Sequence, residues 1–252
     1  MLDTNYKSIR HFTYLNKFLF IVPTIIIFLF FISLVSLSSG AVSTTYNETF
    51  EYLLNFILNS SEIDPVKEKV ISNIRFPRII LSILVGASLA VSGASLQGIF
   101  KNPMADPGII GVSSGAAVGA VLVISLGFAS YSIFMLPVFS FIGGLSAALL
   151  VFLISRFASN SSSTAFILSG LAVSAFLNSL ISLILVSSKK FGELTSILNW
   201  LAGGFQDSRW EHVYITFPVV LISLPFLLIY SNKINILSLS DDSAKTLGLN
   251  IN

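Results

Sequence analysis

Few residues in this 252-residue sequence have the types and spacing that carry catalysis or metal binding. There is no HExxH zinc motif, no GxSxG nucleophile turn and no GxxxxGK[ST] phosphate loop. Cysteine is absent, and neither His11 nor His212 has a second ligand at metal spacing. We therefore expect no enzyme activity, no cofactor and no metal site. The chain is not expected to hydrolyse ATP, so any energy source must be a partner or an ion gradient.

A stripe of small and polar residues recurs at a spacing of four in the segment Thr164 to Val186. On a helix this spacing places the four residues on one face. Such a stripe is compatible with close helix packing, the commoner use of small residues in membrane bundles, or with the lining of a polar pathway. Both interpretations stay open at this stage. The members of the stripe are Gly170, Ser174, Asn178 and Ser182.

A charged, proline-containing stretch, "KNPMADPG" from Lys101 to Gly108, lies between two apolar segments. A residue that precedes proline is disfavoured in the helical region, so Asn102-Pro103 and Asp106-Pro107 predict a tight reversal of the chain. We expect these four residues to fix the geometry of the turn rather than to bind a ligand.

The composition places these features in a membrane protein. Hydrophobic residues make up 54% of the chain and charged residues only 10%, against about 25% charged residues in soluble domains. The net charge of +2 is small and the basic residues are dispersed along the chain, which argues against a nucleic-acid partner. The fold class expected is all-α, a polytopic transmembrane helical bundle.

Six hydrophobic runs approach the roughly 20 residues that cross a bilayer. The first is too long for a signal peptide, and we expect it to be a retained anchor. Lysines and arginines in the short loops and before the first run favour a cytoplasmic N-terminus. The predicted spans are Phe18 to Leu37, Ile79 to Phe100, Ile109 to Phe128, Tyr131 to Ile154, Thr164 to Val186, and Val213 to Tyr230.

Small residues recur every four positions in the second and third predicted spans. Gly86, Ala90, Ala94 and Gly98 mark the second span, and a GxxxGxxxG stripe from Gly111 to Gly119 marks the third. Helices in membranes approach closely through such residues, so these two spans are predicted to pack on each other.

Aspartate, glutamate, lysine, arginine and histidine are absent from all six predicted spans. Proton-coupled carriers and intramembrane enzymes usually need such groups at depth, so both classes are disfavoured. A sodium-coupled carrier that uses backbone carbonyls at broken helices stays open, since Pro218 and Pro225 interrupt the sixth span. Outside the spans, the pattern from Phe50 to Ile57 predicts a short amphipathic helix, and Trp200 and Trp210 suit the aromatic belt.

Four stretches of the sequence stand out as motifs. The longest and most specific is "GASLAVSGASLQGIFKNPMADPGIIGVSSGA", Gly86 to Ala116. The other three are "RFPR" from Arg75 to Arg78, "NWLAGGF" from Asn199 to Phe205, and "LSLSDDSAKTLGLN" from Leu237 to Asn250. In their order and spacing they resemble the membrane subunits of bacterial ABC importers for iron-siderophores, haem and cobalamin, the FecCD-type permeases. The resemblance covers nearly everything from Arg75 onward.

The resemblance implies a permease in the bacterial cytoplasmic (inner) membrane that works as a homodimer. Two cytoplasmic ATPase subunits would use ATP, and an extracytoplasmic substrate-binding protein would deliver a metal chelate. An iron-siderophore or haem is the expected substrate, with cobalamin as the alternative. By the family's pattern, Arg75 and Arg78 would dock the binding protein; two interfacial snorkelling arginines are the alternative.

The resemblance also implies a helix that couples the permease to its ATPase and a cytoplasmic gate. "SNSSST", Ser159 to Thr164, matches the place of the gate, so Ser161, Ser162, Ser163 and Thr164 join Ser174 and Asn178 as pathway or gate residues. Ser240 suits the first position of the coupling helix. The expected coupling residues are Leu239, Asp241, Asp242, Ala244, Leu247 and Gly248.

The chain departs from the family in its extent. Members have about ten spans in a first helix plus two inverted repeats, in keeping with many transporters. Residues 1–252 are therefore expected to be a partial permease domain with the first helix, one four-helix repeat, the sixth span and the coupling segment. The second repeat is missing. An ion-coupled carrier and a non-transporting membrane scaffold remain the alternatives from other classes.

Overall fold

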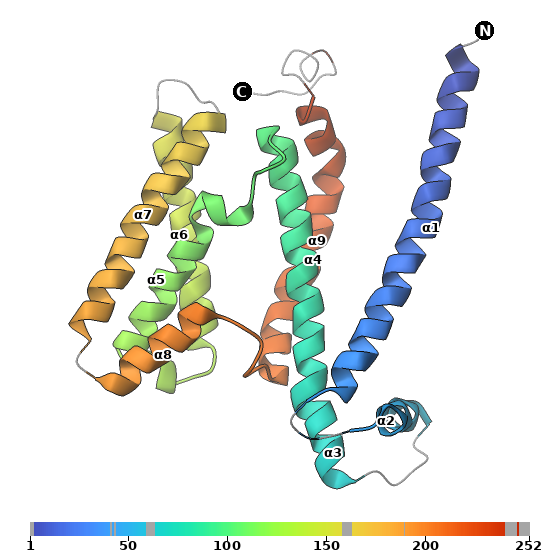
Figure 1. Ribbon diagram of the computed structural model, residues 1–252. Helices are drawn as coiled ribbons and strands as arrows, with labels where there is room; N and C mark the ends of the chain where they lie inside the picture. Colours follow the sequence, from blue (N-terminus) through green and yellow to red (C-terminus); the bar gives the residue numbers. More distant parts are fainter. Residues whose placement is uncertain are drawn as a thin grey trace. The chain divides into compact units, whose positions relative to one another are not determined.

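The computed structural model describes residues 3–40, 42, 44–58, 64–157, 163–188, 190–239 and 246 (Figure 1). Within these ranges the chain is largely helical and contains no β-strand. Contacts divide the chain into two compact units. The first, here the N-terminal unit, comprises residues 1–82 and 206–213, and the second, the bundle unit, comprises residues 83–205 and 214–252.

Five helices of the described chain are long and apolar enough to cross a membrane, as five of the six predicted spans require. Their apolar segments are Leu19–Ser38, Pro65–Phe100, Met135–Phe157, Thr164–Ser187 and Trp210–Leu237. The first lies in α1 (Asp3–Ser38). The others lie in α3 (Pro65–Val70) with α4 (Phe76–Phe100), in α6 (Met135–Phe157), in α7 (Ser163–Ser187) and in α9 (Trp210–Leu237).

The third predicted span is shorter than expected. Its helix, α5 (Val112–Ser125), has 14 residues, which at 1.5 Å per residue spans about 21 Å of a hydrocarbon core about 30 Å thick. Pro107–Ile110 forms the 3₁₀ turn η2, and Gly111 follows in the left-handed region with φ 81°. The predicted span began at Ile109, but the α-helix begins only after this left-handed residue.

The N-terminal unit contains short helices with well-formed ends. In α2 (Tyr46–Leu58), Glu48 N–H donates to Thr45 Oγ1 and Thr45 N–H donates to Glu48 Oε2, which is a capping box. In α3 (Pro65–Val70), Asp64 Oδ1 accepts from the Val66 N–H at 2.9 Å. The expected amphipathic helix is thus present as α2. A π-helical turn, η1 (Ile71–Arg75), joins α3 to α4 (Phe76–Phe100).

The bundle unit is built on the close approach of α5 to α6 (Met135–Phe157). A Cβ on Gly115 would lie 2.5 Å from the Ala147 Cβ and nearer still to the Gly143 carbonyl oxygen. A Cβ on Gly119 would overlap the Phe139 carbonyl. Only glycine permits this separation of the two backbones, because any side chain at these positions would overlap the facing helix.

The predicted packing of the second span on the third is therefore wrong. The stripe of α5 faces α6, whose Gly143 and Gly144 provide the complementary surface. On α4, Gly86 has no atom within 4 Å of an added Cβ, and Ala90 and Ala94 are exposed. Only Gly98 of that stripe is tightly packed, with an added Cβ 2.9 Å from Ile234 of α9 (Trp210–Leu237).

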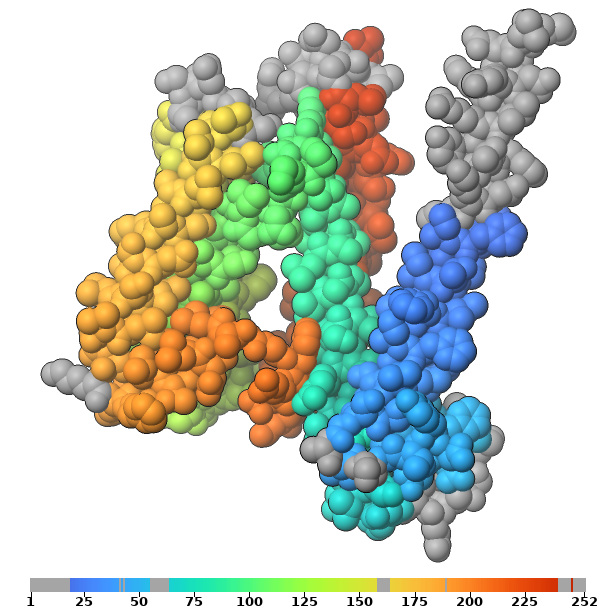
Figure 2. Space-filling model, viewed as in Figure 1, coloured from blue at the N-terminus to red at the C-terminus, as the bar shows by residue number. Residues whose placement is uncertain are grey.

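Two apolar clusters complete the bundle unit. The first is built from Ala147, Val151, Val173 and Leu177 of α6 and α7 (Ser163–Ser187). The second joins Val121 and Ile181 to Ile197 of α8 (Phe191–Ala202), a helix that the sequence analysis did not predict. One side of α7 is open in the space-filling view (Figure 2). Phe176 of this helix is 63% exposed.

Candidate functional site

The proline loop of the bundle unit consists of two successive turns. Asn102 Oδ1 accepts the Met104 N–H at 2.9 Å, and Asp106 Oδ1 accepts the Gly108 N–H at 2.7 Å. Each of these side chains mimics a backbone turn, and each residue precedes a proline, Pro103 or Pro107. Asp106 is extended, with φ −133° and ψ 144°. All four turn residues therefore serve local geometry.

The loop begins with backbone strain and ends against α7. Lys101 has φ 51°, a left-handed conformation that is uncommon for residues other than glycine. At the other end, an added Cβ on Gly170 would overlap the Ile109 carbonyl, and one on Gly111 would lie 3.4 Å from Ser174 Oγ. The loop is thus docked on Gly170 and Ser174, the first two residues of the polar stripe of α7.

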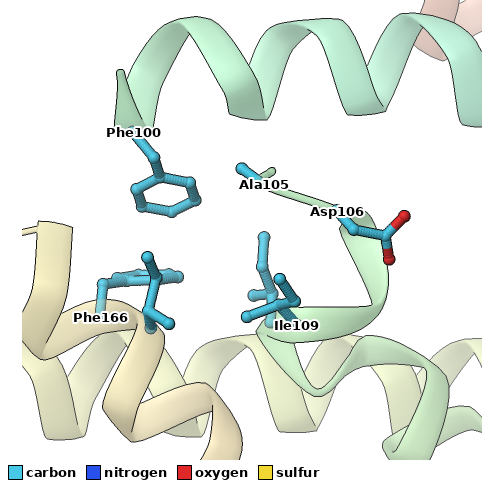
Figure 3. A pocket seen from close by; sticks show the side chains of 7 residues that line it. Phe100, Ala105, Asp106, Ile109 and Phe166 are labelled. Atoms are coloured by element: carbon cyan, nitrogen blue, oxygen red, sulfur yellow. The ribbon is translucent and has the colours of Figure 1, made fainter. Parts of the chain in front are cut away.

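A small apolar pocket lies beneath the loop (Figure 3). The rings of Phe100 and Phe166 are 5.2 Å apart between centroids, and Ile109 lies beside them. The Asp106 carboxylate points away from the rings. The pocket therefore has no convergent polar groups to bind a charged ligand.

The polar stripe on α7 is divided by its surroundings. Gly170 is buried and Ser174 half-buried, whereas Asn178 and Ser182 are exposed. Ser182 donates its hydroxyl to the Asn178 carbonyl at 3.0 Å, so the hydroxyl is satisfied within the helix. Gly170 and Ser174 thus lie against the proline loop, whereas the Asn178 side chain is exposed.

The gate and coupling predictions fall partly outside the described residues. Thr164 is exposed near the start of α7, and Ser163 is the first residue of that helix. Ser161 and Ser162 lie outside the described ranges. Leu239 is 49% exposed two residues beyond α9. The remaining coupling residues, Asp241, Asp242, Ala244, Leu247 and Gly248, also lie outside the described ranges.

The two arginines of the RFPR motif occupy different environments in the N-terminal unit. Arg75 is only 6% exposed. Its Nη1 donates to the Leu37 carbonyl and to Thr44 Oγ1, each at 2.5 Å, and its Nη2 donates to the Val42 carbonyl. Arg78 is half-buried, and its Nη2 donates to the Gln206 carbonyl at 2.8 Å. Arg75 therefore points into the protein, and Arg78 lies nearer the surface.

Trp210 has a defined contact that the sequence analysis did not foresee. Its indole N–H donates to the Ser72 carbonyl at 2.9 Å, and its ring lies 6.0 Å from that of Phe76. The aromatic-belt assignment accounted for its position near a span but not for this long-range partner. A π-helical turn has no simple sequence signal, so the pairing could not be derived from the residues alone.

An ion pair connects the two short helices of the same unit. Lys67 Nζ lies 2.7 Å from Glu48 Oε1. The hydrogen bond from Lys67, together with that from the Thr45 backbone, lowers the pKa of the Glu48 carboxyl below its ordinary value of 4.5. In the described part of the chain no group of three or more histidine, aspartate or glutamate side chains could hold a metal ion.

Comparison with known proteins identifies the chain's relatives. It is 42% identical over 182 residues to the cobalamin import system permease protein BtuC of Halobacterium salinarum, covering 72% of this chain and 48% of the relative. It is 42% identical over 188 residues to the molybdate import system permease protein MolB of Haemophilus influenzae, covering 75% and 55%. The Fe(3+) dicitrate transport system permease protein FecC of Escherichia coli is 38% identical over 189 residues, with 73% and 55% covered.

A solved structure is also similar. It is described as an inward-facing conformation of a metal-chelate type ABC transporter, and it matches with a TM-score of 0.77 and 35% identity, covering 92% of this chain and 68% of that chain. The chain thus spans about half the length of the curated relatives named above. The model of the FecCD transport family matches residues 25–252. This integral membrane chain belongs to the FecCD transport family.

Proposed function

We propose that this chain is the permease subunit of an ABC importer that moves a metal chelate across the bacterial cytoplasmic membrane. The observation that carries the proposal is the family match over residues 25–252. The long apolar helices of the described residues are compatible with a membrane conduit. The chain itself would need no cofactor, because a separate subunit would bind and hydrolyse ATP.

The proposed substrate is an iron complex, a ferric siderophore or haem, with cobalamin as the alternative. The iron-citrate and cobalamin names of two relatives support this pair of candidates. Another relative, at the same 42% identity as the cobalamin permease, is named as a molybdate permease. Molybdate, an oxyanion, must therefore be tested as a substrate as well. Substrate choice is best measured on the binding protein, which would capture the chelate before transport.

The proposed assembly is a homodimer with two ATPase subunits on the cytoplasmic side and a binding protein on the other side. The N-terminus would be cytoplasmic, which places the proline loop and residues 239–248 on the ATPase side. Leu239, Asp241, Asp242, Ala244, Leu247 and Gly248 would form the surface that contacts the ATPase. The sequence supports this assignment, because it predicts a capped helix here with Asp241 and Asp242 in the first turn, where the helix dipole would stabilise them.

Copurification tests the assembly directly. The chain is coexpressed with a candidate ABC ATPase subunit from the same organism, and the ATPase is expected to copurify from detergent. Asp241→Lys combined with Leu247→Asp should abolish its capture, because it reverses one charge and places another at an apolar contact. Lys101→Asn, in the other loop on the same proposed side, is the control that should leave capture unchanged. Capture that persists in the double variant contradicts the coupling assignment.

The pathway is proposed to follow the exposed part of the α7 stripe, and the gate to lie at Ser161 to Thr164. Ser174 would line the pathway at the edge of the packed region, and Asn178 within the exposed region. Asn178→Leu should reduce the transport rate, whereas Phe176→Leu, on another face of α7, should not. Equal rates for wild type and Asn178→Leu would assign the pathway to another surface.

A further inference from the structure

The short helix α2 of the N-terminal unit carries a strip of exposed apolar side chains. Tyr46, Phe50 and Leu54 follow one another at a spacing of four, and all three are exposed, Phe50 by 58%. On a helix this spacing places the three side chains on one face. They form a continuous apolar surface, here called the α2 strip.

The remaining sides of α2 have different surroundings. Thr49 is buried, and burial also raises the pKa of the Tyr52 phenol, so this side faces the protein. Asn47 and Glu51 are polar and exposed. Successive residues of a helix are turned by about 100°, which places the α2 strip between the Thr49 side and the Glu51 side. The helix therefore has a protein-facing side, an apolar exposed side and a polar exposed side.

The connection to α1 defines the depth of the α2 strip. The apolar segment of α1, Leu19–Ser38, is 20 residues long, which matches the roughly 30 Å of a hydrocarbon core. Ser38 therefore lies close to the boundary between hydrocarbon and headgroups. Thr44, two residues before α2, donates its hydroxyl to the Ser38 carbonyl at 2.9 Å. The helix α2 thus begins at that boundary.

The direction of α2 keeps the helix at this depth. Figure 1 shows α2 end-on, whereas α1 is seen along its length, so α2 lies across α1 within the N-terminal unit. A helix that lies across a membrane-spanning helix runs along the membrane surface. The two helices are in contact, and the most apolar stretch of α1 has no buried residue. The α2 strip therefore adjoins a surface that already faces lipid.

The charges of α2 favour apolar burial over attraction to anionic headgroups. Glu48 and Glu51 are the charged residues in the sequence of this helix, which contains no lysine or arginine. Lys67 of α3 lies 2.7 Å from Glu48 and is paired with it. Aromatic residues are enriched at the interface between water and hydrocarbon, and the α2 strip contains two of them. A bilayer surface without net charge is therefore sufficient to bind it.

We propose that α2 is an interfacial helix whose α2 strip is buried in the headgroup and upper acyl region of the membrane at the end of α1. The partner of the strip is a lipid surface, and the polar side with Asn47 and Glu51 faces water. The helix then fixes the depth of the N-terminal unit at the membrane surface. The inference requires only that the chain is an integral membrane protein, so its failure would leave the proposed transport function unaffected.

Spin-label accessibility in phosphatidylcholine nanodiscs tests this proposal, because the chain has no cysteine and each introduced cysteine is unique. Labels at Phe50→Cys and Leu54→Cys should be reached by oxygen, which concentrates in the membrane, and shielded from a water-soluble nickel chelate. Labels at Asn47→Cys and Glu51→Cys should show the opposite. A label at Phe28→Cys, on the exposed surface of α1, is the reference for deep lipid, and the α2 strip should lie shallower.

Two results of the accessibility measurement would overturn the proposal. Nickel access at Phe50→Cys and Leu54→Cys equal to that at Glu51→Cys would place the α2 strip in water. Shielding of the first two labels from both oxygen and nickel would place a protein surface, such as a second copy of the chain, over the strip.

Amide hydrogen exchange without any label guards against a perturbing nitroxide. In the same nanodiscs, Phe50→Ser should speed exchange over residues 46–54 by about fivefold or more, because α2 loses a large apolar contact with lipid. Phe50→Trp should keep wild-type protection. Glu51→Ser, on the polar side of the same helix, is the matched control and should leave exchange unchanged. Equal exchange in Phe50→Ser and Glu51→Ser would contradict the anchoring of α2 by lipid.

Discussion

In the bundle unit, α5 and α6 approach until the backbone of one helix touches the other, whereas in the N-terminal unit the segments are joined by side-chain hydrogen bonds. Gly115, Gly119 and Gly143 make the first kind of contact. Arg75 and Trp210 make the second. Close packing needs small residues and apolar surroundings, while bonded side chains can tie irregular backbone together.

This difference implies different sensitivities to substitution. Adding one methyl group between α5 and α6 should disrupt the bundle unit, because the backbone atoms of the two helices are already in contact there. In the N-terminal unit the important changes are those that remove a donor or an acceptor, since a buried partner is then left unsatisfied. The predictions below test this contrast in order of expected effect.

Gly115→Ala should produce the largest effect. Its methyl group would lie 2.5 Å from the Ala147 Cβ and overlap the Gly143 carbonyl, so the free energy of unfolding should fall by about 2–3 kcal/mol through overpacking. Denaturant titration in detergent micelles measures this change. Gly86→Ala, on the open face of α4, should cause no loss; equal losses in the two variants would contradict the packing difference.

Lys101→Val should destabilise the bundle unit at the start of the proline loop. A β-branched residue at φ 51° is strongly disfavoured, and the cost should be about 1–2 kcal/mol. Asparagine tolerates this conformation, so Lys101→Asn should be close to wild type in the same titration. If both variants unfold at the wild-type midpoint, the loop does not hold Lys101 in the left-handed conformation.

Trp210→Phe should destabilise the N-terminal unit by about 1 kcal/mol, because the Ser72 carbonyl loses its indole donor while most of the ring contact with Phe76 is kept. Thermal unfolding followed by near-ultraviolet circular dichroism reports the change. Trp200→Phe is the control, since the Trp200 indole has no hydrogen-bond partner among the described residues. A similar shift in both variants would indicate a general effect of losing an indole.

The smallest effect should come from the half-buried Glu48–Lys67 pair, which is partly screened by solvent. The folded-state pKa of Glu48 is lowered, so its contribution to stability is full above the ordinary value of 4.5 and is lost as the pH falls through the lowered pKa. Glu48→Gln should therefore melt slightly below wild type at neutral pH, with the gap closing in acid. If the difference in melting temperature between wild type and Glu48→Gln instead widens in acid, the pKa of Glu48 is not lowered in the folded state.

The positions of the long helices could be predicted because a hydrophobic run of bilayer length has few other stable states. The turn at Asn102 and Asp106 was also predictable, since proline restricts the residue before it whatever the surrounding fold. The short helix α8 was missed because its apolar residues fall below the span length that the analysis used. Ile197, fully buried in that helix, contributes to the core between α5 and α7.

The sequence predicted less well which helix packs against each helix face. The glycine stripe of α5 indicated close packing correctly, but spacing alone does not say which helix lies opposite. We predicted α4 as the packing partner of α5 because the two are adjacent in the sequence. In the structure α5 packs on α6, whose glycines complement its own. Likewise, the RFPR motif predicted one role for both arginines, whereas Arg75 is buried against the α1–α2 connection and Arg78 is half-buried.

Transport by the reconstituted system tests the central proposal most directly. Proteoliposomes that contain this permease and its ATPase are supplied with the binding protein loaded with a ⁵⁵Fe-labelled ferric siderophore, with ⁵⁷Co-cobalamin and ⁹⁹Mo-molybdate in parallel. We expect accumulation of one labelled substrate that requires both ATP and the binding protein. Accumulation that needs neither and follows an imposed sodium gradient would contradict the account and identify a secondary carrier.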